Sequence, residues 1–480
     1  MASPKVQHSA ARFGRAAMLL PLLFTGACAS IPNLGDKPEP LAVSDYATST
    51  TLAGDSAEWP ADGWWQTYRD PQLSALIDEA LAGSPDLAAA AARMRTAQGY
   101  AQAAGAALQP TIDAFGSVDA SKLSQNGTMP AAATPDGWND NGSVGIGMKL
   151  DLDLWGKNRA AMRAARLDAT AAELELAEAR LALTTGIAAT YAELAALHAQ
   201  RDSLESALDI RSQTLNLVKQ RVDAGLDNDS ALRLAEARIP QTRSDLAATD
   251  EAIALTKNAL AALVGAGPDR ALAIGRPQIA ALHAQGLPAT ASVDLLGRRP
   301  DVAAARARVE AADQRTKEAR AAFYPNISLS ALTGLQSFGV DNLFRDGSHF
   351  GSFGPAVSLP IFHGGALSGQ YRGRRGQYDE VVALYDRQVV QALRETADAV
   401  TSQKMLVQRL ASSREALAGY EDAHRLAQLR YKQGLSTYLD VLTAEESVVV
   451  ARLRVAELQT RSFTLDVQLI RALGGGFAAA

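Results

Sequence analysis

One proline-free stretch, residues 157–222, limits the folds open to this chain more than any other feature. It holds a single glycine, and leucines recur seven apart at Leu167, Leu174 and Leu181. Apolar residues at this spacing, among many alanine, glutamate and arginine residues, are typical of a helix that packs lengthwise against other helices. At 1.5 Å per residue the helix would be roughly 100 Å long, too long for an ordinary globular domain. We therefore expect a coiled coil or a helical tube.

The same organisation occurs twice along the chain. Residues 366–432 form a second proline-free stretch, and the two stretches are followed closely by Gly225 and Gly434. Upstream, Ser-Pro-Asp at 84–86 corresponds to Arg-Pro-Asp at 299–301. Matching segments in the same order indicate a tandem structural repeat. Each half is expected to run helix, strand, strand, long helix and return helix.

Short segments in each half alternate apolar and polar residues, as in a β-strand with one apolar face. Residues 143–154 show this best, with apolar side chains at every second position from Val144 to Leu154. The expected strands are residues 111–120, 143–154, 326–335 and 352–361. Their length suits tilted membrane-spanning strands, although the strands of a soluble sandwich would alternate in the same way.

The predicted elements divide the chain into five segments. These are a signal peptide at 1–27, an extended tether at 28–60, a first repeat at 61–264, a connection at 265–293 and a second repeat at 294–480. The long helix and return helix are expected at 157–222 and 229–263 in the first repeat, and at 366–432 and 437–472 in the second.

The N-terminus resembles the export signal of a bacterial lipoprotein. Basic residues precede a short apolar core, and Cys28 directly follows Gly26 and Ala27. In such proteins the signal is removed at the cysteine, which is then lipidated. Ala29 stands where an aspartate would retain a lipoprotein at the inner membrane, so sorting to the outer membrane is expected. The alternative is ordinary cleavage near Ala27, which leaves a free cysteine.

The composition argues against several classes of function. A single cysteine rules out an intramolecular disulfide and a thiolate metal cage, and the six histidines are scattered. We find no glycine-rich phosphate loop and no serine nucleophile elbow. The net charge of −5 comes with no basic face for nucleic acid. We therefore expect no enzyme activity, no cofactor, no metal and no nucleic-acid partner.

Four strands cannot close a membrane barrel alone, and an open sheet edge is not tolerated in lipid. Membrane strands would therefore have to form a barrel shared between copies, with eight strands in a dimer or twelve in a trimer. Only the larger barrel leaves room for a lumen. The long helices would continue such a barrel as a tube.

With these features, the chain resembles the outer-membrane efflux proteins of the TolC/OprM class, in the lipoprotein (NodT-like) branch that serves proton-driven (RND) multidrug pumps. The resemblance covers essentially the whole mature chain. Its motifs are Cys28, Trp64-Trp65 with Asp70-Pro71, Leu295-Leu296-Gly-Arg298-Arg299-Pro300-Asp301, Ala321-Ala-Phe-Tyr324-Pro325, and Arg430-Tyr431 with Gly434 and Tyr438-Leu439-Asp440-Val441-Leu442.

The resemblance implies a homotrimer with a 12-stranded β-barrel on a long α-helical tunnel in the periplasm. A belt around the middle would include residues 265–293 and the C-terminal end. It also implies two partners, an inner-membrane RND-type pump and a periplasmic adaptor (membrane fusion) protein. The protein would be anchored in the lipid of the Gram-negative outer membrane.

The same resemblance places a periplasmic gate on the second helix turn, with Asp440 projecting into the pore and Tyr431 holding the closed state. Ser436 and Thr443 stand where TolC has an arginine and a second aspartate, so Leu439 or Leu442 could seal the pore by apolar packing.

Asp440 also has a second interpretation. Thr437 and Asp440 form the sequence pattern of a helix capping box, and both roles can hold together. On the first turn, Asp223, Asp227 and Asp229 are expected to be solvated turn and cap residues rather than pore-lining ones.

The two turns carry matching Gly-Leu pairs. They are expected to form the adaptor-facing tip, at Gly225, Leu226, Gly434 and Leu435, although these glycines could serve only to end the helices.

Three functions are compatible with these observations. The leading hypothesis is a passive exit duct for drugs or other small molecules, closed at its periplasmic tip. The second is an outer-membrane duct for secreted polypeptides, and the third is a lipid-anchored coiled-coil scaffold without a pore.

Overall fold

The computed structural model describes residues 30–42, 45–48, 50–52, 57–128, 130–278, 288 and 297–478. The expected signal peptide and Cys28 lie outside these residues. The main helices are α1 (Pro71–Gly83), α2 (Pro85–Ala106), α3 (Lys157–Asp223), α4 (Asp229–Val264), α5 (Asp269–Leu272), α7 (Pro300–Ala321), α8 (Ala366–Lys432) and α9 (Tyr438–Ala472). The strands are β1 (Thr111–Ser121), β2 (Asn139–Asp151), β3 (Asn326–Phe338) and β4 (His349–Ser358).

The chain forms two compact units. The strand unit holds the described residues up to Glu39, Arg95–Thr170 and Ala307–Ala383. The helix unit holds Pro40–Met94, Ala171–Arg306 and Leu384–Ala480. Among the described residues, no helix contains a stretch that is both long and apolar enough to cross a bilayer.

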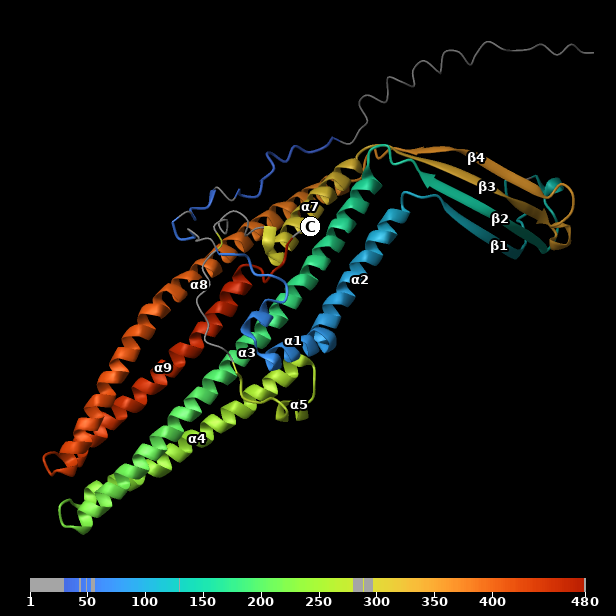
Figure 1. The fold of residues 1–480 in the computed structure, drawn as a ribbon. Helices are drawn as coiled ribbons and strands as arrows, with labels where there is room; N and C mark the ends of the chain where they lie inside the picture. Colours follow the sequence, from blue (N-terminus) through green and yellow to red (C-terminus); the bar gives the residue numbers. More distant parts are fainter. Residues whose placement is uncertain are drawn as a thin grey trace, which may run out of the picture. The chain divides into compact units, whose positions relative to one another are not determined.

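In the strand unit, four antiparallel strands lie in the order β1-β2-β3-β4 (Figure 1). The repeats are joined at the centre of the sheet, where β2 pairs with β3 and Ile146 lies opposite Thr333. The outer sides of β1 and β4 pair with no described strand. Such edges are costly in lipid, so one chain does not complete this sheet.

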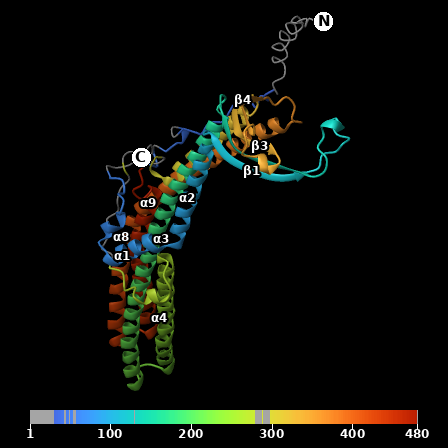
Figure 2. The ribbon, with the colours of Figure 1, turned by 90° about the vertical axis from the view of Figure 1, so that its right-hand side faces the viewer.

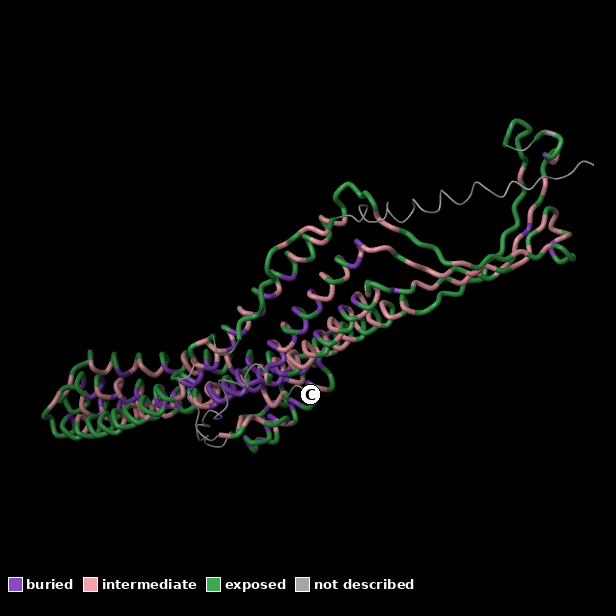
Figure 3. The backbone as a smooth tube through the Cα atoms, turned by 90° about the horizontal axis from the view of Figure 1, so that it is seen from above, coloured by how far each residue is buried: buried purple, intermediate pink, exposed green. Residues whose placement is uncertain are grey.

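The sheet has one apolar and one polar face. Ile112, Met148, Ala331 and Phe353 are aligned across the four strands on the apolar face. Ile112 and Phe353 are 66% and 76% exposed, and Figure 3 shows the strands mostly in the intermediate and exposed colours. No described second sheet covers the apolar face, which contradicts a soluble sandwich. An uncovered apolar band is instead the surface that lipid contacts.

Two strands begin and end earlier than the sequence predicts. β2 covers Asn139–Asp151 instead of 143–154, and β4 covers His349–Ser358 instead of 352–361. β2 stops because Asp153 takes a left-handed φ of 46° and its carboxylate accepts hydrogen bonds from the backbone N–H groups of Asn158 and Arg159. Asp153 thus caps α3. Apolar alternation continues through Leu152, whose N–H makes a last hydrogen bond to the carbonyl of Ile327 in β3 at 2.9 Å, and through Leu154 beyond the strand pairing.

In the helix unit, α3 lies beside α4 and α8 beside α9 (Figures 1 and 2). A core near the middle is built on Trp64, Trp65 and Tyr68 of a short 3₁₀ helix, η2 (Trp64–Tyr68). The carboxylate of Asp70 caps α1 and accepts a hydrogen bond from the hydroxyl of Tyr191 at 2.8 Å. The Trp-Trp and Asp-Pro motif therefore locks η2 and α1 onto the long helix α3.

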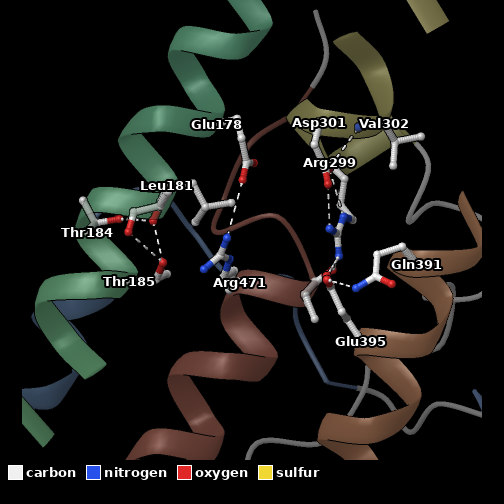
Figure 4. Close-up of polar contacts among 12 residues, drawn as sticks. Glu178, Leu181, Thr184, Thr185, Arg299, Asp301, Val302, Gln391, Glu395 and Arg471 are labelled. Atoms are coloured by element: carbon white, nitrogen blue, oxygen red, sulfur yellow. Dashed lines mark hydrogen bonds and ion pairs between the residues drawn. The ribbon is translucent and has the colours of Figure 1, made fainter. Parts of the chain in front are cut away.

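A second motif residue, Arg299, ties α7 to both helices of the second repeat (Figure 4). Its guanidinium contacts Asp301 at 2.7 Å and Glu395 of α8 at 2.8 Å, and donates to the carbonyl of Ala472 at the end of α9. Nearby, burial raises the pKa of Glu178 on α3 to about 7. The Arg-Pro-Asp motif thus holds α7, α8 and α9 together through polar contacts.

Candidate functional site

Both helix hairpins of the helix unit turn on the same backbone motif. The N–H of Leu226 donates to the carbonyl of Arg221, and that of Leu435 to the carbonyl of Arg430, both at 2.8 Å. Gly225 and Gly434 have φ values of 70° and 75°, which only glycine adopts freely. These are Schellman motifs, which end helices tightly.

The residue after each glycine is an exposed leucine. Leu226 is 64% exposed and Leu435 is 69% exposed. In many Schellman motifs this position packs back on its own helix, but here both side chains remain at the surface. Each hairpin therefore presents one apolar side chain at its end.

Asp440 caps α9. Its Oδ2 accepts hydrogen bonds from the backbone N–H of Thr437 at 2.8 Å and from the Thr437 hydroxyl at 2.9 Å. The hydrogen bond from the Thr437 backbone is the main reason that the pKa of Asp440 lies below its usual value. The carboxylate is nevertheless fully exposed, so the cap leaves it open to solvent.

Tyr431 joins the two hairpins. It is 1% exposed, and its hydroxyl donates to Asp227 Oδ2 at 2.5 Å. The guanidinium of Arg221 lies 4.5 Å from the Tyr431 ring centroid, with its Nε 3.9 Å from the same carboxylate. Burial and the carboxylate both raise the pKa of Tyr431, so its hydroxyl stays protonated as a donor.

This contact corrects the expectation for the first turn. Asp227 is not simply a solvated turn residue, since its side chain is only 14% exposed and it accepts a hydrogen bond from the second repeat. Asp229 lies in the first turn of α4, which Asn228 caps, as expected of a turn residue.

The leucines expected at the gate lie in different environments. Leu439 is 63% exposed, whereas Leu442 is 4% exposed. Leu442 packs with Val218, Tyr438 and Val441 in an apolar cluster of the same protomer. Leu442 is therefore part of the protomer's own core, and Leu439 is the leucine of this pair that remains exposed on the second turn.

A buried ion pair connects α3 and α9. The Nε of Arg211 on α3 is 3.2 Å from Glu445 Oε1 on α9, and its Nη1 donates to the hydroxyl of Thr242 on α4 at 2.5 Å. The Glu445 side chain is 2% exposed. The network links three helices from both repeats. The sequence alone does not show that Arg211 and Glu445 face each other.

The described residues of the tip thus bring Tyr431 and Asp227 together and leave Leu439 and Asp440 exposed on the second turn. The sequence analysis did not single out Arg221. It lies four residues before Gly225, just as Arg430 lies four residues before Gly434 in the second repeat. The tip therefore consists of two hairpins joined by the hydrogen bond from Tyr431 to Asp227, by a shared apolar cluster and by the ion pair between Arg211 and Glu445.

Comparisons with known proteins agree with this architecture. The multidrug resistance outer membrane protein MdtP of Shigella flexneri is 33% identical over 467 residues, covering 94% of this chain and 93% of MdtP. The fusaric acid resistance protein FusA of Burkholderia cepacia is 36% identical over 365 residues, covering 74% of this chain and 68% of FusA.

A solved structure extends the comparison to the fold. The outer membrane protein VceC of Vibrio cholerae superposes with a TM-score of 0.84 at 45% identity, covering 87% of this chain and 100% of VceC. The sequence profile of the family described as "Outer membrane efflux protein" matches residues 76–266 and 291–475, which span both repeats. This chain belongs to the outer membrane efflux protein family.

Proposed function

We propose that this protein is the outer-membrane exit duct of a tripartite efflux system, passively conducting drugs or other small organic molecules. On this proposal three copies, each contributing four strands, form a 12-stranded barrel on a helical tunnel. The observation that carries the proposal is the four-stranded sheet with two unpaired edges and an uncovered apolar face, which closure between copies completes. The pore-less scaffold leaves that sheet unexplained.

The proposed substrate class is inferred from the names of the relatives. MdtP is named for multidrug resistance and FusA for resistance to fusaric acid. Neither name refers to a secreted polypeptide, which favours small molecules as cargo. On this proposal the energy for transport comes from the inner-membrane pump.

The gate is proposed at the second helix turn. Asp440 is exposed and ionised, so three copies around a threefold axis concentrate negative potential and favour cations. The exposed Leu439 narrows the same level. Tyr431 holds the hairpins of one protomer together through Asp227, which supports the closed arrangement.

The adaptor is proposed to dock on the turns themselves. Gly225 and Gly434 bring each chain to a tight reversal, and Leu226 and Leu435 supply an exposed apolar contact on each. The pump, of the RND type, is reached through this adaptor.

The N-terminus is proposed to be lipidated at Cys28. Residues 30–42 form no helix or strand, as a tether would. The tether contacts the strand unit through an ion pair between Lys37 and Asp313 and a hydrogen bond from the Tyr378 hydroxyl to the Pro38 carbonyl at 2.9 Å.

Single-channel recording in planar bilayers tests the duct and its gate. Wild-type trimers are expected to give small, cation-preferring conductance steps, and Asp440→Asn to lose the preference. If Asp440→Asn leaves the cation selectivity of the conductance steps unchanged, the constriction lies somewhere other than at Asp440. Well-folded trimers that never conduct, even with adaptor and pump present, would contradict the duct.

A further inference from the structure

A basic groove lies in the strand unit where α3 begins and α7 ends. It encloses about 520 Å³, and its lining includes the basic side chains Arg159, Arg163, Lys317 and Arg320. The rings of Trp155 and Tyr324 line it as well, and no carboxylate does. Clustered cations without an acidic neighbour in the lining mark a place where an anion is favoured.

Two of these cations are free to bind an anion. Arg163 and Arg320 are exposed and form no ion pair with any described residue. The other two are partly neutralised from outside the groove, Arg159 by Asp153 at 3.2 Å and Lys317 by Asp313 at 2.8 Å. The groove therefore keeps a net positive charge.

The aromatic pair indicates where the groove lies relative to the membrane. The rings of Trp155 and Tyr324 are stacked with centroids 4.9 Å apart, and the Trp155 indole N–H donates to the Pro325 carbonyl at 2.8 Å. β2 ends at Asp151 and β3 begins at Asn326, so the pair lies directly beyond the membrane strands. Tryptophan and tyrosine at this position sit at the level of lipid headgroups.

Two further observations place the groove toward the inner leaflet. This inference rests on the proposed duct, in which the groove lies at the helix-bearing end of the barrel, facing the periplasm. Asp313, the partner of Lys317, also pairs with Lys37 of the tether, so the groove shares a side of α7 with the tether. A tether that leads to a membrane anchor runs outside the barrel, where lipid is.

Among the groove's lining, Gln314 carries a buried Oε1 without a hydrogen-bond partner. That oxygen can accept a hydrogen bond from a hydroxyl on the ligand.

We propose that this groove binds the headgroup of an anionic glycerophospholipid of the inner leaflet, with its phosphodiester on Arg163 and Arg320. Phosphatidylglycerol fits best, because its terminal glycerol supplies the hydroxyl donor that Gln314 lacks. Its acyl chains then lie along the apolar face of the strands.

Native mass spectrometry of the detergent-purified full-length trimer tests the proposal, with phosphatidylglycerol and phosphatidylcholine of identical acyl chains as probes. Phosphatidylglycerol should bind at least about tenfold more tightly than phosphatidylcholine, because only it retains a net negative charge. Combining Arg163→Gln with Arg320→Gln should weaken phosphatidylglycerol binding roughly thirtyfold and leave phosphatidylcholine unchanged.

The matched control removes the same charge elsewhere. Arg409 and Arg414 of α8 are exposed and form no ion pair with a described residue, so their double substitution by glutamine should leave lipid binding unchanged. The same spectra report whether each variant remains a trimer.

Three results would overturn the proposal: equal binding of the two lipids, undiminished phosphatidylglycerol binding by the Arg163 and Arg320 variant, or an equal loss in the control. Displacement of phosphatidylglycerol by excess inorganic phosphate would assign the groove to a free anion instead of a lipid. Conductance is not the readout, so failure here leaves the duct proposal standing.

Discussion

Replacing Tyr431 by phenylalanine should raise the open fraction of the channel. The substitution keeps the buried ring but removes the hydroxyl that donates to Asp227 at 2.5 Å. A hydrogen bond to a charged group contributes about 1.5–3 kcal/mol. Arg221 does not replace it, because its Nε lies 3.9 Å from the carboxylate.

The magnitude follows directly if this contact exists only in the closed state. A loss of about 2 kcal/mol shifts the ratio of open to closed channels about thirtyfold. Contacts that partly persist in the open state reduce the factor, so about fivefold is the smallest effect consistent with a gating role.

Single-channel open fraction in planar bilayers measures this ratio. Tyr438→Phe is the matched control, because Tyr438 is buried in the same cluster but its hydroxyl donates to no described residue. Equal open fractions for Tyr431→Phe and wild type would contradict a gating role for this hydrogen bond. So would an equal rise in Tyr438→Phe, since the cause would then be loosened packing.

Three further predictions concern other contacts. Glu445→Leu leaves Arg211 buried without its partner and should destabilise the tip by about 3–5 kcal/mol, which faster hydrogen exchange in α9 would reveal; unchanged exchange would contradict it. Burial raises the pKa of Glu178 to about 7 from 4.5, so the folded protein keeps a proton that the unfolded chain has lost. Stability should therefore fall as pH rises through this window, and Glu178→Gln should flatten the dependence of trimer melting temperature on pH. The lowered pKa of Asp440 has the opposite sign: its cap is present above the ordinary carboxyl pKa and lost in acid. Protection of the amides at the start of α9, taken as the observed exchange rate relative to the intrinsic rate at the same pH, should therefore fall at low pH in wild type but not in Asp440→Ala.

The helices could be predicted from sequence closely because their signals are local. Proline-free heptads and a following glycine define α3 as Lys157–Asp223 and α8 as Ala366–Lys432, within a residue of expectation. The strand ends could not be predicted as well. Alternation continues past Asp151, but the ladder stops where the carboxylate of Asp153 turns to cap α3.

The tip residues show a second limit. A turn aspartate reads as solvated, and only the approach of α8 reveals that Asp227 accepts from Tyr431. The sequence leaves Leu439 and Leu442 as equal candidates for the pore, because the side of the helix that faces the protomer core depends on how four helices pack. Arg211 and Glu445 are far apart in sequence, and no local pattern around either residue predicts that they pair.

We propose that this chain carries drugs out across the outer membrane. The most direct test is accumulation of a fluorescent drug in cells that lack the gene, with and without the cloned wild-type chain. We expect high accumulation in the deletion strain. The wild-type chain should restore the parental level, whereas a chain in which Leu226 and Leu435 are both replaced by aspartate should not. Identical accumulation in parental and deletion strains, with pump and adaptor expressed and no second duct present, would contradict it.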